Sequence, residues 1–586
     1  MNKKKYRLIS LLILVILISV FSFGCGNKLS QKKVQKNFDN FLYDLFVEEV
    51  QSDSLSLNYS LSQPDKFGIR NTDVSLGTVS ANQIKESLSI TEQYLETLNS
   101  FDYDSLTKDQ QLTFDITKNY LQSALELGQY PYYNEYLGPS TGVQAQLPIL
   151  LAEYNFYEKE DIERYLELLP CVYDYFEDLA QFQREKSAQG LFMSDHVADT
   201  IIDQCKSFIN NPKENFLITY FEEKIDQYEN LTEEEVLSYK EANKDGVINY
   251  IIPAYKMLIT CLQDLKGTGT NNRGLYYFPE GKNYYESLAK FKTGSHKSME
   301  EMTSMLESSI ADALLQVSNL AATDPLLIDK YMAFQSFPIT EPDDILADLR
   351  NNISEDFPDL VSVECEIKYV HESLEEYLSP ALYLVPALDD YTNNNIYING
   401  NDEENLSMIY TTIAHEGYPG HLYQCVYFRN QNPAPIRTLM NFMGYDEGWA
   451  TYVEMYSYHL AGIDENLAEF LSINNSAILC MYARTDIGIH YEGWSKKNAV
   501  AYMEHFFGDK TIAEAVYYTL LEEPGIYLPY AIGYLEILEL KAKAEEKLDD
   551  DFDTKDFHKF VLDIGPAQFD IIDDHLDSWI DTNKDH

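Results

Sequence analysis

The chain has 586 residues, of which 45% are hydrophobic and 13% aromatic, a composition typical of a folded protein with a large core. It carries 44 Lys and Arg against 95 Asp and Glu, so its formal net charge at pH 7 is −51. This charge repels nucleic acid and anionic lipid headgroups, which excludes both as expected partners. We attribute most of the charge to a solvated acidic surface.

Residues 1–24 predict a signal peptide. Basic residues lie within positions 3–7, residues 8–23 are mostly apolar, and Gly24 precedes Cys25. The run from Ser22 to Cys25 resembles a bacterial lipobox, although it lacks Leu at the third position before the cysteine. We expect Cys25 to be lipidated and residues 25–34 to form a tether, with plain secretion as the alternative. The protein would then be extracytoplasmic and anchored to the bacterial cell membrane by lipid alone.

The other six cysteines are dispersed along the chain and contain no C-x-x-C pair. In a domain of this size we expect them to be free and mostly buried, and not to form a disulfide framework. They are Cys171, Cys205, Cys261, Cys365, Cys425 and Cys480.

Hydrophobic periodicity predicts a mainly helical chain. Apolar residues recur every three or four positions in 38–46, 160–185, 192–210, 212–230 and 297–320. Thr107 with Gln110, and Thr232 with Glu235, have the spacing of capping boxes that begin helices. The second of these helices should end or bend near Pro253.

Strand signals are few and lie just before the segment that carries the chemistry. Residues 361–370, 381–386 and 396–399 predict a small sheet. Its edge could bind an extended peptide, or the sheet could simply pack beneath a helix. Without repeats or a clear linker, residues 35–586 read as a single unit, with a helical lobe at about 35–330 and a metal-site lobe at about 331–586.

Residues 411–454 contain a candidate metal site. His415 is followed by Glu416, and His421 lies six residues after His415. Histidines four residues apart share one face of a helix, whereas a six-residue interval places them roughly 240° apart on an undistorted helix. Gly417, Pro419 and Gly420 lie between them. We expect a widened turn of the π-bulge kind to restore convergence; the alternative is a helix end with two unrelated histidines.

Several runs resemble one known family. They are HEGYPGHLYQ (415–424), DEGWATYVE (446–454), RTDIGIHYEGWS (484–495), YLPYAIGYLEI (527–537), FHKFVLDIGPAQFDII (557–572), GPSTGVQAQLP (138–148) and GLYYFPEGKNYY (274–285). Together they resemble the bacterial domain-of-unknown-function family 885, which is grouped with the gluzincin-type metallopeptidases. The resemblance implies a large, mainly α, two-lobed cleft fold with a small β-sheet beside the metal-binding helix. It also implies a single zinc, and it supplies no substrate.

The proposed zinc ligands are His415, His421 and Glu447, with the fourth position left for water. Glu416 would be the general base that takes the proton of a metal-activated water. Glu454 is a rival third ligand, or else a partner that orients an imidazole. We favour Glu447 because its interval after the second histidine resembles that of the helical gluzincins.

A peptidase also needs groups that stabilise an oxyanion and bind the substrate. The resemblance points to Tyr530 and His490 for the oxyanion, since a tyrosine and a histidine downstream of the third ligand have this role in helical gluzincins. Tyr534 is a weaker substrate-binding candidate, because most of the 46 tyrosines must be packing residues. Arg484 could bind a substrate carboxylate, or it could pair with Asp486 or another acid.

The sequence therefore predicts an extracytoplasmic zinc-dependent metallopeptidase with one Zn²⁺ per chain, acting on peptides or small proteins. One alternative is a non-catalytic substrate-binding lipoprotein that retains the fold. Another is a zinc hydrolase of a different amide or ester. Glu416 favours an enzyme over the binding protein, since a binding protein does not need a carboxylate beside its first ligand.

Overall fold

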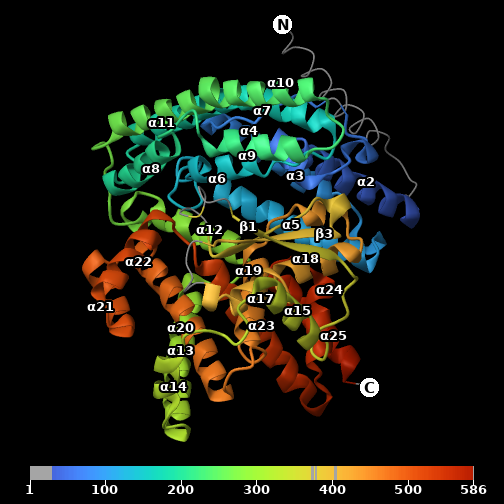
Figure 1. The fold of residues 1–586 in the computed structure, drawn as a ribbon. Helices are drawn as coiled ribbons and strands as arrows, with labels where there is room; N and C mark the ends of the chain where they lie inside the picture. The colour runs from blue at the N-terminus through green and yellow to red at the C-terminus, as the bar shows by residue number, and fades with distance from the viewer. Residues whose placement is uncertain (1–29, 71, 371–374, 376–378, 401–405, 585–586) are drawn as a thin grey trace.

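The computed structural model describes residues 30–584 except 71, 371–374, 376–378 and 401–405. The predicted signal peptide and Cys25 lie outside the described residues. Within the described part, no helix is long and apolar enough to cross a membrane. The predicted fold class is confirmed at this level: the chain is mainly helical and contains a small three-stranded sheet (Figure 1).

The described part of the chain begins with four helices, α2 (Gln31–Val50), α3 (Ser54–Ser60), α4 (Ala81–Asn99) and α5 (Lys108–Gly128). Of these, α2 and α3 lie at the right of Figure 1. The capping box that begins α5 is confirmed, because the side chains of Thr107 and Gln110 each bond the other's backbone N–H. This pairing satisfies two of the N–H groups that a helix start leaves without partners.

The next helices form a layer over the top of the molecule in Figure 1. They are α6 (Val143–Ala152), α7 (Lys159–Ala188), α8 (Asp195–Phe208), α9 (Phe216–Gln227), α10 (Glu233–Gly246) and α11 (Ile252–Leu265). Thr232 and Glu235 form the predicted capping box of α10. The helix ends before Pro253 as expected: a π turn separates α10 from α11, and the proline lies in the first turn of α11.

The sheet follows α12 (Gly281–Thr293), α13 (Met299–Thr323), α14 (Leu327–Ala333) and α15 (Pro342–Asn352). All three predicted strands are confirmed as β1 (Glu364–Tyr369), β2 (Ala381–Leu384) and β3 (Asn393–Ile398). Their order is β1-β3-β2, with β1 parallel and β2 antiparallel to β3. Glu364 lies opposite Asn393, and Ala381 lies opposite Ile398. Since β3 lies between the other two strands, β2 is an edge strand.

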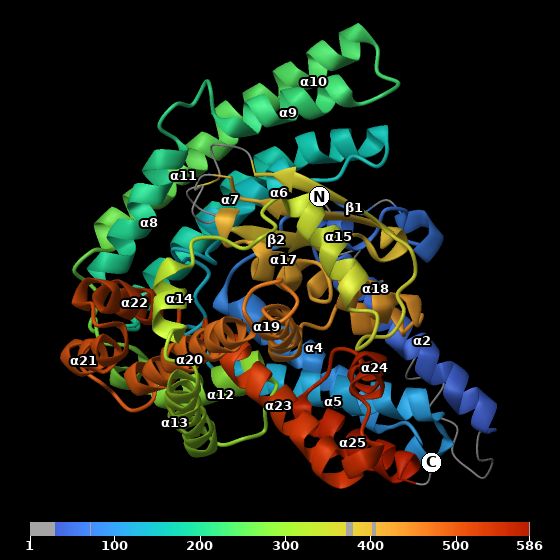
Figure 2. The same ribbon diagram turned by 60° about the horizontal axis from the view of Figure 1, so that its bottom comes forward.

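The last helices form the opposite half of the molecule (Figure 2). They are α17 (Tyr410–Glu416), α18 (His421–Asn430), α19 (Met443–Ser457), α20 (Glu465–His490), α21 (Lys496–Phe507), α22 (Lys510–Glu522), α23 (Leu528–Leu548), α24 (Thr554–Ile564) and α25 (Phe569–Asn583). In both views α17 and α19 lie centrally, between the sheet and the later helices α20–α25.

Three large apolar clusters form the core. One joins α2 and α5 to α17–α19 and α23–α25, a second lies within α6–α11, and a third joins α12 and α13 to α20–α23. The division into lobes near residue 330 stays a prediction. The six cysteines are free, as predicted, and Cys205, Cys261 and Cys480 are buried.

Candidate metal centre

The predicted widening between His415 and His421 is present, because two backbone bonds there span six residues, but it occurs at a break between two helices and not within one continuous helix. Helix α17 ends at Glu416, and α18 begins at His421. Gly417–Gly420 form a tight connection in which the Tyr418–Pro419 peptide bond is cis. A separate helix therefore presents the second histidine.

The two histidines nevertheless converge, as the site hypothesis required. Their ring centroids lie 4.8 Å apart with the planes nearly perpendicular. One ligand atom each from His415, His421 and Glu447 lie within 4.8 Å of one another, so this group could hold a metal ion. Among the described residues it is the only group of three or more His, Cys, Asp or Glu side chains arranged in this way.

Backbone bonds across six residues hold the connection closed. Gly420 N–H donates to the carbonyl of Ala414 at 3.0 Å, and Tyr423 N–H donates to the carbonyl of Gly417 at 3.2 Å. A Cβ on Gly420 would lie 1.8 Å from the carbonyl oxygen of His415. Only glycine permits this approach of one backbone to another, so Gly420 sets the spacing between the histidines.

Trp449 fixes the same connection from α19. Its indole Nε1–H donates to the carbonyl of Pro419 at 2.9 Å, and the side chain is completely buried. Helix α19 in turn packs closely on α23, because a Cβ on Gly448 would lie 2.4 Å from the backbone of Gly533. This glycine contact lets α19 bring Glu447, and α23 bring Tyr530, to the histidine pair.

The carboxylate of Glu447 faces both imidazoles. Its Oε2 lies 3.4 Å from Nε2 of His415 and 3.5 Å from Nε2 of His421, longer than an ordinary N–H···O bond. This oxygen is buried and lacks a hydrogen-bond partner. A buried carboxylate oxygen without a donor is costly, and a cation between the three side chains would satisfy it. The donor set of two imidazoles and one carboxylate also suits zinc.

Glu454 has the second of the two roles considered for it, that of a partner that orients an imidazole. Its Oε2 lies 3.0 Å from Nδ1 of His415. A carboxylate at Nδ1 fixes the tautomer that leaves Nε2 free as a ligand. Glu454 therefore orients His415, and the geometry favours Glu447 as the third ligand.

The site is electrostatically coupled. Burial alone would raise the pKa of Glu447, but His421 and His415 hold it far below its usual value. Burial would lower the pKa values of the two histidines, yet the neighbouring carboxylates raise both. Asp446, which the sequence analysis did not single out, lies beside this group: burial raises its pKa to about 7, against the lowering effect of His421.

Glu416 lies next to the first histidine and is held by the sheet. Its Oε2 accepts the backbone N–H of Tyr383, in edge strand β2, at 2.8 Å. Burial raises the pKa of Glu416, and the nearby His415 and His421 oppose that rise. A raised pKa suits a carboxylate that must accept a proton and later release it. The sheet therefore does contact the candidate base, which agrees with the predicted sheet beside the metal-binding helix.

Tyr530 is the predicted oxyanion residue that lies at the centre. Its ring is nearly parallel to that of His415, with centroids 6.2 Å apart. Burial raises the pKa of its hydroxyl, and the charges of Glu447 and Glu416 raise it further. The hydroxyl therefore keeps its proton near neutral pH and remains a hydrogen-bond donor.

The other three predicted residues, His490, Tyr534 and Arg484, have surroundings that differ from those of the metal centre. His490 is buried, with Nδ1 accepting from Leu275 N–H at 3.1 Å and Nε2 bonded to the carbonyl of Leu520 at 2.8 Å, so neither ring nitrogen is free for a substrate. Tyr534 is half-buried between two core clusters.

Arg484 adopts the ion-paired alternative and contacts acids of the protein itself. Its Nε donates to Glu307 at 2.7 Å, and its Nη2 donates to Glu492 at 3.1 Å. The guanidinium also lies over the ring of Trp494, 4.6 Å from its centroid. Asp486, the partner considered from sequence, instead binds the backbone N–H of Gly525.

Comparison with known proteins places the chain in a family. The sequence model of the family described as "Bacterial protein of unknown function (DUF885)" matches residues 63–576. The chain belongs to the DUF885 family. No curated protein matches this DUF885 chain.

Two solved structures resemble the DUF885 protein described here. One is titled as a "putative lipoprotein" from Colwellia psychrerythraea, with TM-score 0.80 and 19% identity, covering 94% of this chain and 99% of that one. The other is titled as a "putative lipoprotein of unknown function" from Shewanella oneidensis, with TM-score 0.62 and 16% identity, covering 94% and 100%. At these identities the similarity establishes the fold.

Proposed function

We propose that this DUF885 protein is an extracytoplasmic, zinc-dependent peptidase with one metal ion per chain. The observation that carries the proposal is the trio of buried His415 and half-buried His421 and Glu447, with Glu416 directly beside it. The trio offers nitrogen and carboxylate ligands, and the Oε2 of Glu447 lacks a donor. A purely structural cluster would have no need of a further carboxylate at the same point.

Zinc bound by these three side chains would act as a Lewis acid and lower the pKa of a water molecule at its open position to about 7. The protein's part is to hold and move protons around it. Glu416 takes a proton from the attacking water and passes it to the leaving amine. The N–H of Tyr383 fixes the carboxylate in the orientation that this transfer requires.

Tyr530 would stabilise the oxyanion of the tetrahedral intermediate. The ring of Tyr530 lies beside that of His415, and its protonated hydroxyl lies near Glu447. Tyr530 belongs to α23, whereas Glu416 belongs to α17. A donor already placed where negative charge develops needs no reorganisation during the reaction, which makes such groups effective. His490 is not part of this proposal, because backbone groups engage both of its ring nitrogens.

Edge strand β2 supports a peptide as the substrate. Tyr383 N–H points away from β3 and toward Glu416, so the outer edge of the strand runs past the candidate base. An extended peptide could pair with this edge and place a bond to be cleaved at the metal centre. This arrangement fits the two-lobed, cleft-containing fold of the helical gluzincins, which we include in the proposal.

A lipid anchor at Cys25 is the proposed attachment to the membrane. Support comes from the lipobox-like sequence and from the titles of the two similar structures, both of which name lipoproteins. The strong negative charge makes direct binding to anionic lipid unfavourable.

The test is peptide-library cleavage by residues 26–586, comparing wild type with Glu416→Gln. The variant should keep its zinc and lose at least about a hundredfold in kcat/KM, because glutamine cannot accept the proton. Glu504→Gln, on exposed helix α21, is the matched control and should be fully active. Full activity in Glu416→Gln would refute the assignment. A zinc-loaded wild type that cleaves no peptide would favour the binding-lipoprotein alternative.

A further inference from the structure

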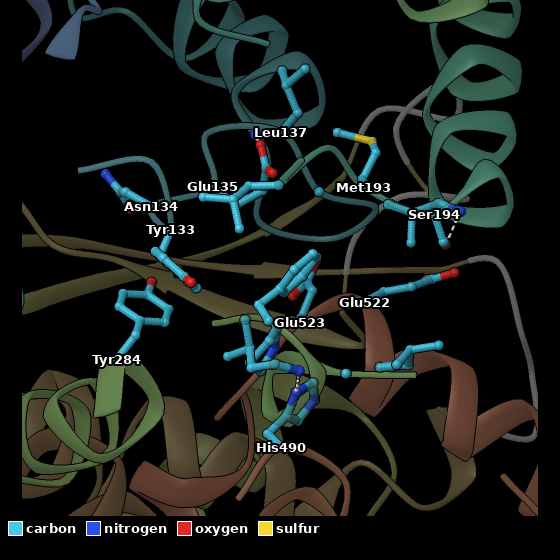
Figure 3. A pocket seen from close by; sticks show the side chains of 18 of the residues that line it. Tyr133, Asn134, Glu135, Leu137, Met193, Ser194, Tyr284, His490, Glu522 and Glu523 are labelled. Atoms are coloured by element: carbon cyan, nitrogen blue, oxygen red, sulfur yellow. Dashed lines mark hydrogen bonds between the residues drawn. The ribbon is translucent and has the colours of Figure 1, made fainter. Parts of the chain in front are cut away.

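A second polar site lies outside the metal centre, in a cavity of about 320 Å³ (Figure 3). Its walls are loop 132–142, the start of α8, segment 271–278, helix α12 and the loop between α22 and α23. Runs 138–148 and 274–285, which resembled the family but contribute nothing to the metal centre, both line it. The volume is that of a small-ligand pocket.

The loop on one side of this cavity is built rigidly. Gly142 packs so tightly that a Cβ there would lie 2.1 Å from the backbone of Gly138. Glutamine amides donate to successive carbonyl oxygens of the loop: Gln144 to Gly138 at 2.5 Å, Gln204 to Pro139 at 2.6 Å and Gln146 to Ser140 at 2.7 Å. Such preorganisation is typical of a binding site and lowers the entropy cost of binding.

Glu523 joins this loop to the other wall and leaves one oxygen without a donor. Its Oε1 accepts the backbone N–H groups of Ser140 at 2.6 Å and Thr141 at 2.9 Å. The residue is only 8% exposed, and its Oε2 is buried without a hydrogen-bond partner. A carboxylate oxygen in this state needs a donor, and a charged donor would satisfy it best.

The cations that line the cavity do not supply that donor. Lys186 forms an ion pair with Glu135, which also accepts from Gln183. The ammonium group of Lys292 donates to the carbonyl of Pro524 at 3.2 Å and makes no hydrogen bond with Glu523. The adjacent Glu522 adds a further acid, paired across 3.4 Å with His196. The cavity lining therefore has three carboxyl groups, of Glu135, Glu522 and Glu523, and only two ammonium groups, of Lys186 and Lys292.

We propose that this cavity binds a protonated primary amine of the substrate through Oε2 of Glu523. A metal ion is disfavoured, because His415, His421 and Glu447 are the only described trio placed to hold one. Apolar side chains, among them Leu137 and Met193, can cover the hydrocarbon beside an ammonium group. The rings of Tyr133 and Tyr284, 5.2 Å apart, add faces that attract a cation.

Side-chain contacts at the start of α23 lead from Glu523 toward the metal centre, and this step rests on the proposed function. Glu523 lies close enough to Tyr527 for its charge to raise the pKa of that hydroxyl, after the effect of burial. The Tyr527 ring lies 6.4 Å from Tyr530, whose ring lies 6.2 Å from His415. These contacts place the cavity within the length of a few extended residues of the metal centre, so we take the amine to belong to a peptide substrate.

Binding to the hydrolytically inactive Glu416→Gln protein tests the proposal, with calorimetry at low salt. The probes are tetra-alanine, N-acetyl-tetra-alanine, and an N-acetylated tetrapeptide with one lysine. At least one amine-bearing peptide should bind about tenfold or more tightly than N-acetyl-tetra-alanine, because a charge-assisted hydrogen bond is lost on acetylation. Tighter binding of tetra-alanine would show that the cavity binds the α-amine of a peptide. Tighter binding of the N-acetylated lysine peptide would show that it binds a lysine side chain.

Glu523→Gln, added to this background, should abolish the preference. Glutamine keeps the Oε1 that accepts from Ser140 and Thr141, so the loop should stay in place, which circular dichroism and thermal melting will check. Glu504→Gln, at an exposed position outside the cavity, is the control: it removes one glutamate from the protein and should preserve the preference. Competition by methylammonium against the preferred peptide provides a second measurement that needs no change at position 523.

Equal affinities for all three probes, or a preference that survives Glu523→Gln, would overturn the proposal. So would an equal loss in Glu504→Gln, because the effect would then come from the overall charge of the protein and not from one contact. Peptide binding is measured separately from hydrolysis, so the cavity proposal and the peptidase proposal can fail independently. An amine preference in a protein that cleaves nothing would refute the peptidase and retain the cavity, whereas hydrolysis without the preference would do the reverse.

Discussion

Gly420→Ala should separate the two histidines without changing either imidazole side chain. A Cβ at this position would lie 1.8 Å from the carbonyl oxygen of His415 and 2.4 Å from that of Ala414. Both contacts are with backbone, so no side-chain rotation relieves them, and the connection must open by at least about 1 Å. Zinc–nitrogen bonds are about 2.0–2.1 Å and tolerate deviations of roughly 0.2 Å. His421 would therefore leave bonding distance.

We expect Gly420→Ala to lose zinc affinity by about a hundredfold, at the upper end for changes that misorient a ligand. Overpacking should also cost about 1–3 kcal/mol of stability. Calorimetric titration with zinc measures the first effect and urea unfolding the second. Gly128→Ala, at the end of α5, is the matched control, because its Cβ meets only the movable side chain of Leu88. Wild-type zinc affinity in Gly420→Ala would refute the proposed role of this close approach.

Three further predictions follow from other contacts of the site and its surroundings. Glu454→Ala should weaken zinc binding about 10–100-fold by freeing Nδ1 of His415, and unchanged affinity would exclude an orienting role. Tyr530→Phe should lower kcat by about a hundredfold while leaving zinc affinity intact, and an unchanged kcat would exclude the oxyanion role. Burial lowers the pKa of His490 to about 4, so the unfolded chain takes up a proton below about pH 6.5 that the folded chain resists. Stability should fall by roughly 2 kcal/mol from this group between pH 7 and 5, and urea unfolding of His490→Gln should show a correspondingly smaller loss.

The parts of the fold predicted correctly are those that local chemistry decides. The capping boxes at Thr107 and Thr232 need only residues three positions apart, β1 is indicated by alternation of apolar and polar residues, and β2 and β3 by short runs rich in β-forming residues. The connection between the histidines was different. Glycine and proline indicate that a regular helix is lost, but they do not distinguish a bulge from a break. The bond from Trp449 to Pro419 and the packing at Gly420 decide it, and the Trp449 contact joins residues 30 positions apart.

The ligand assignment and the remaining site residues show the same limit. Residues seven positions apart, such as Glu447 and Glu454, lie on nearly the same face of a helix, and only the fold shows which imidazole nitrogen each one faces. Arg484 pairs with Glu307, 177 positions away, and His490 accepts from Leu275, 215 positions away. A local sequence pattern cannot indicate contacts between residues so far apart in the chain. The backbone bond from Tyr383 to Glu416 was equally invisible, since any residue type could supply it.

The most direct test of the account is the metal content of residues 26–586, purified as wild type, His421→Ala and His505→Ala. His505 lies on exposed helix α21 and serves as the matched histidine control. We predict about one zinc per chain in wild type and His505→Ala, and its loss in His421→Ala. Zinc that survives His421→Ala, or a wild type that binds none after zinc is added, would contradict the proposed metal centre.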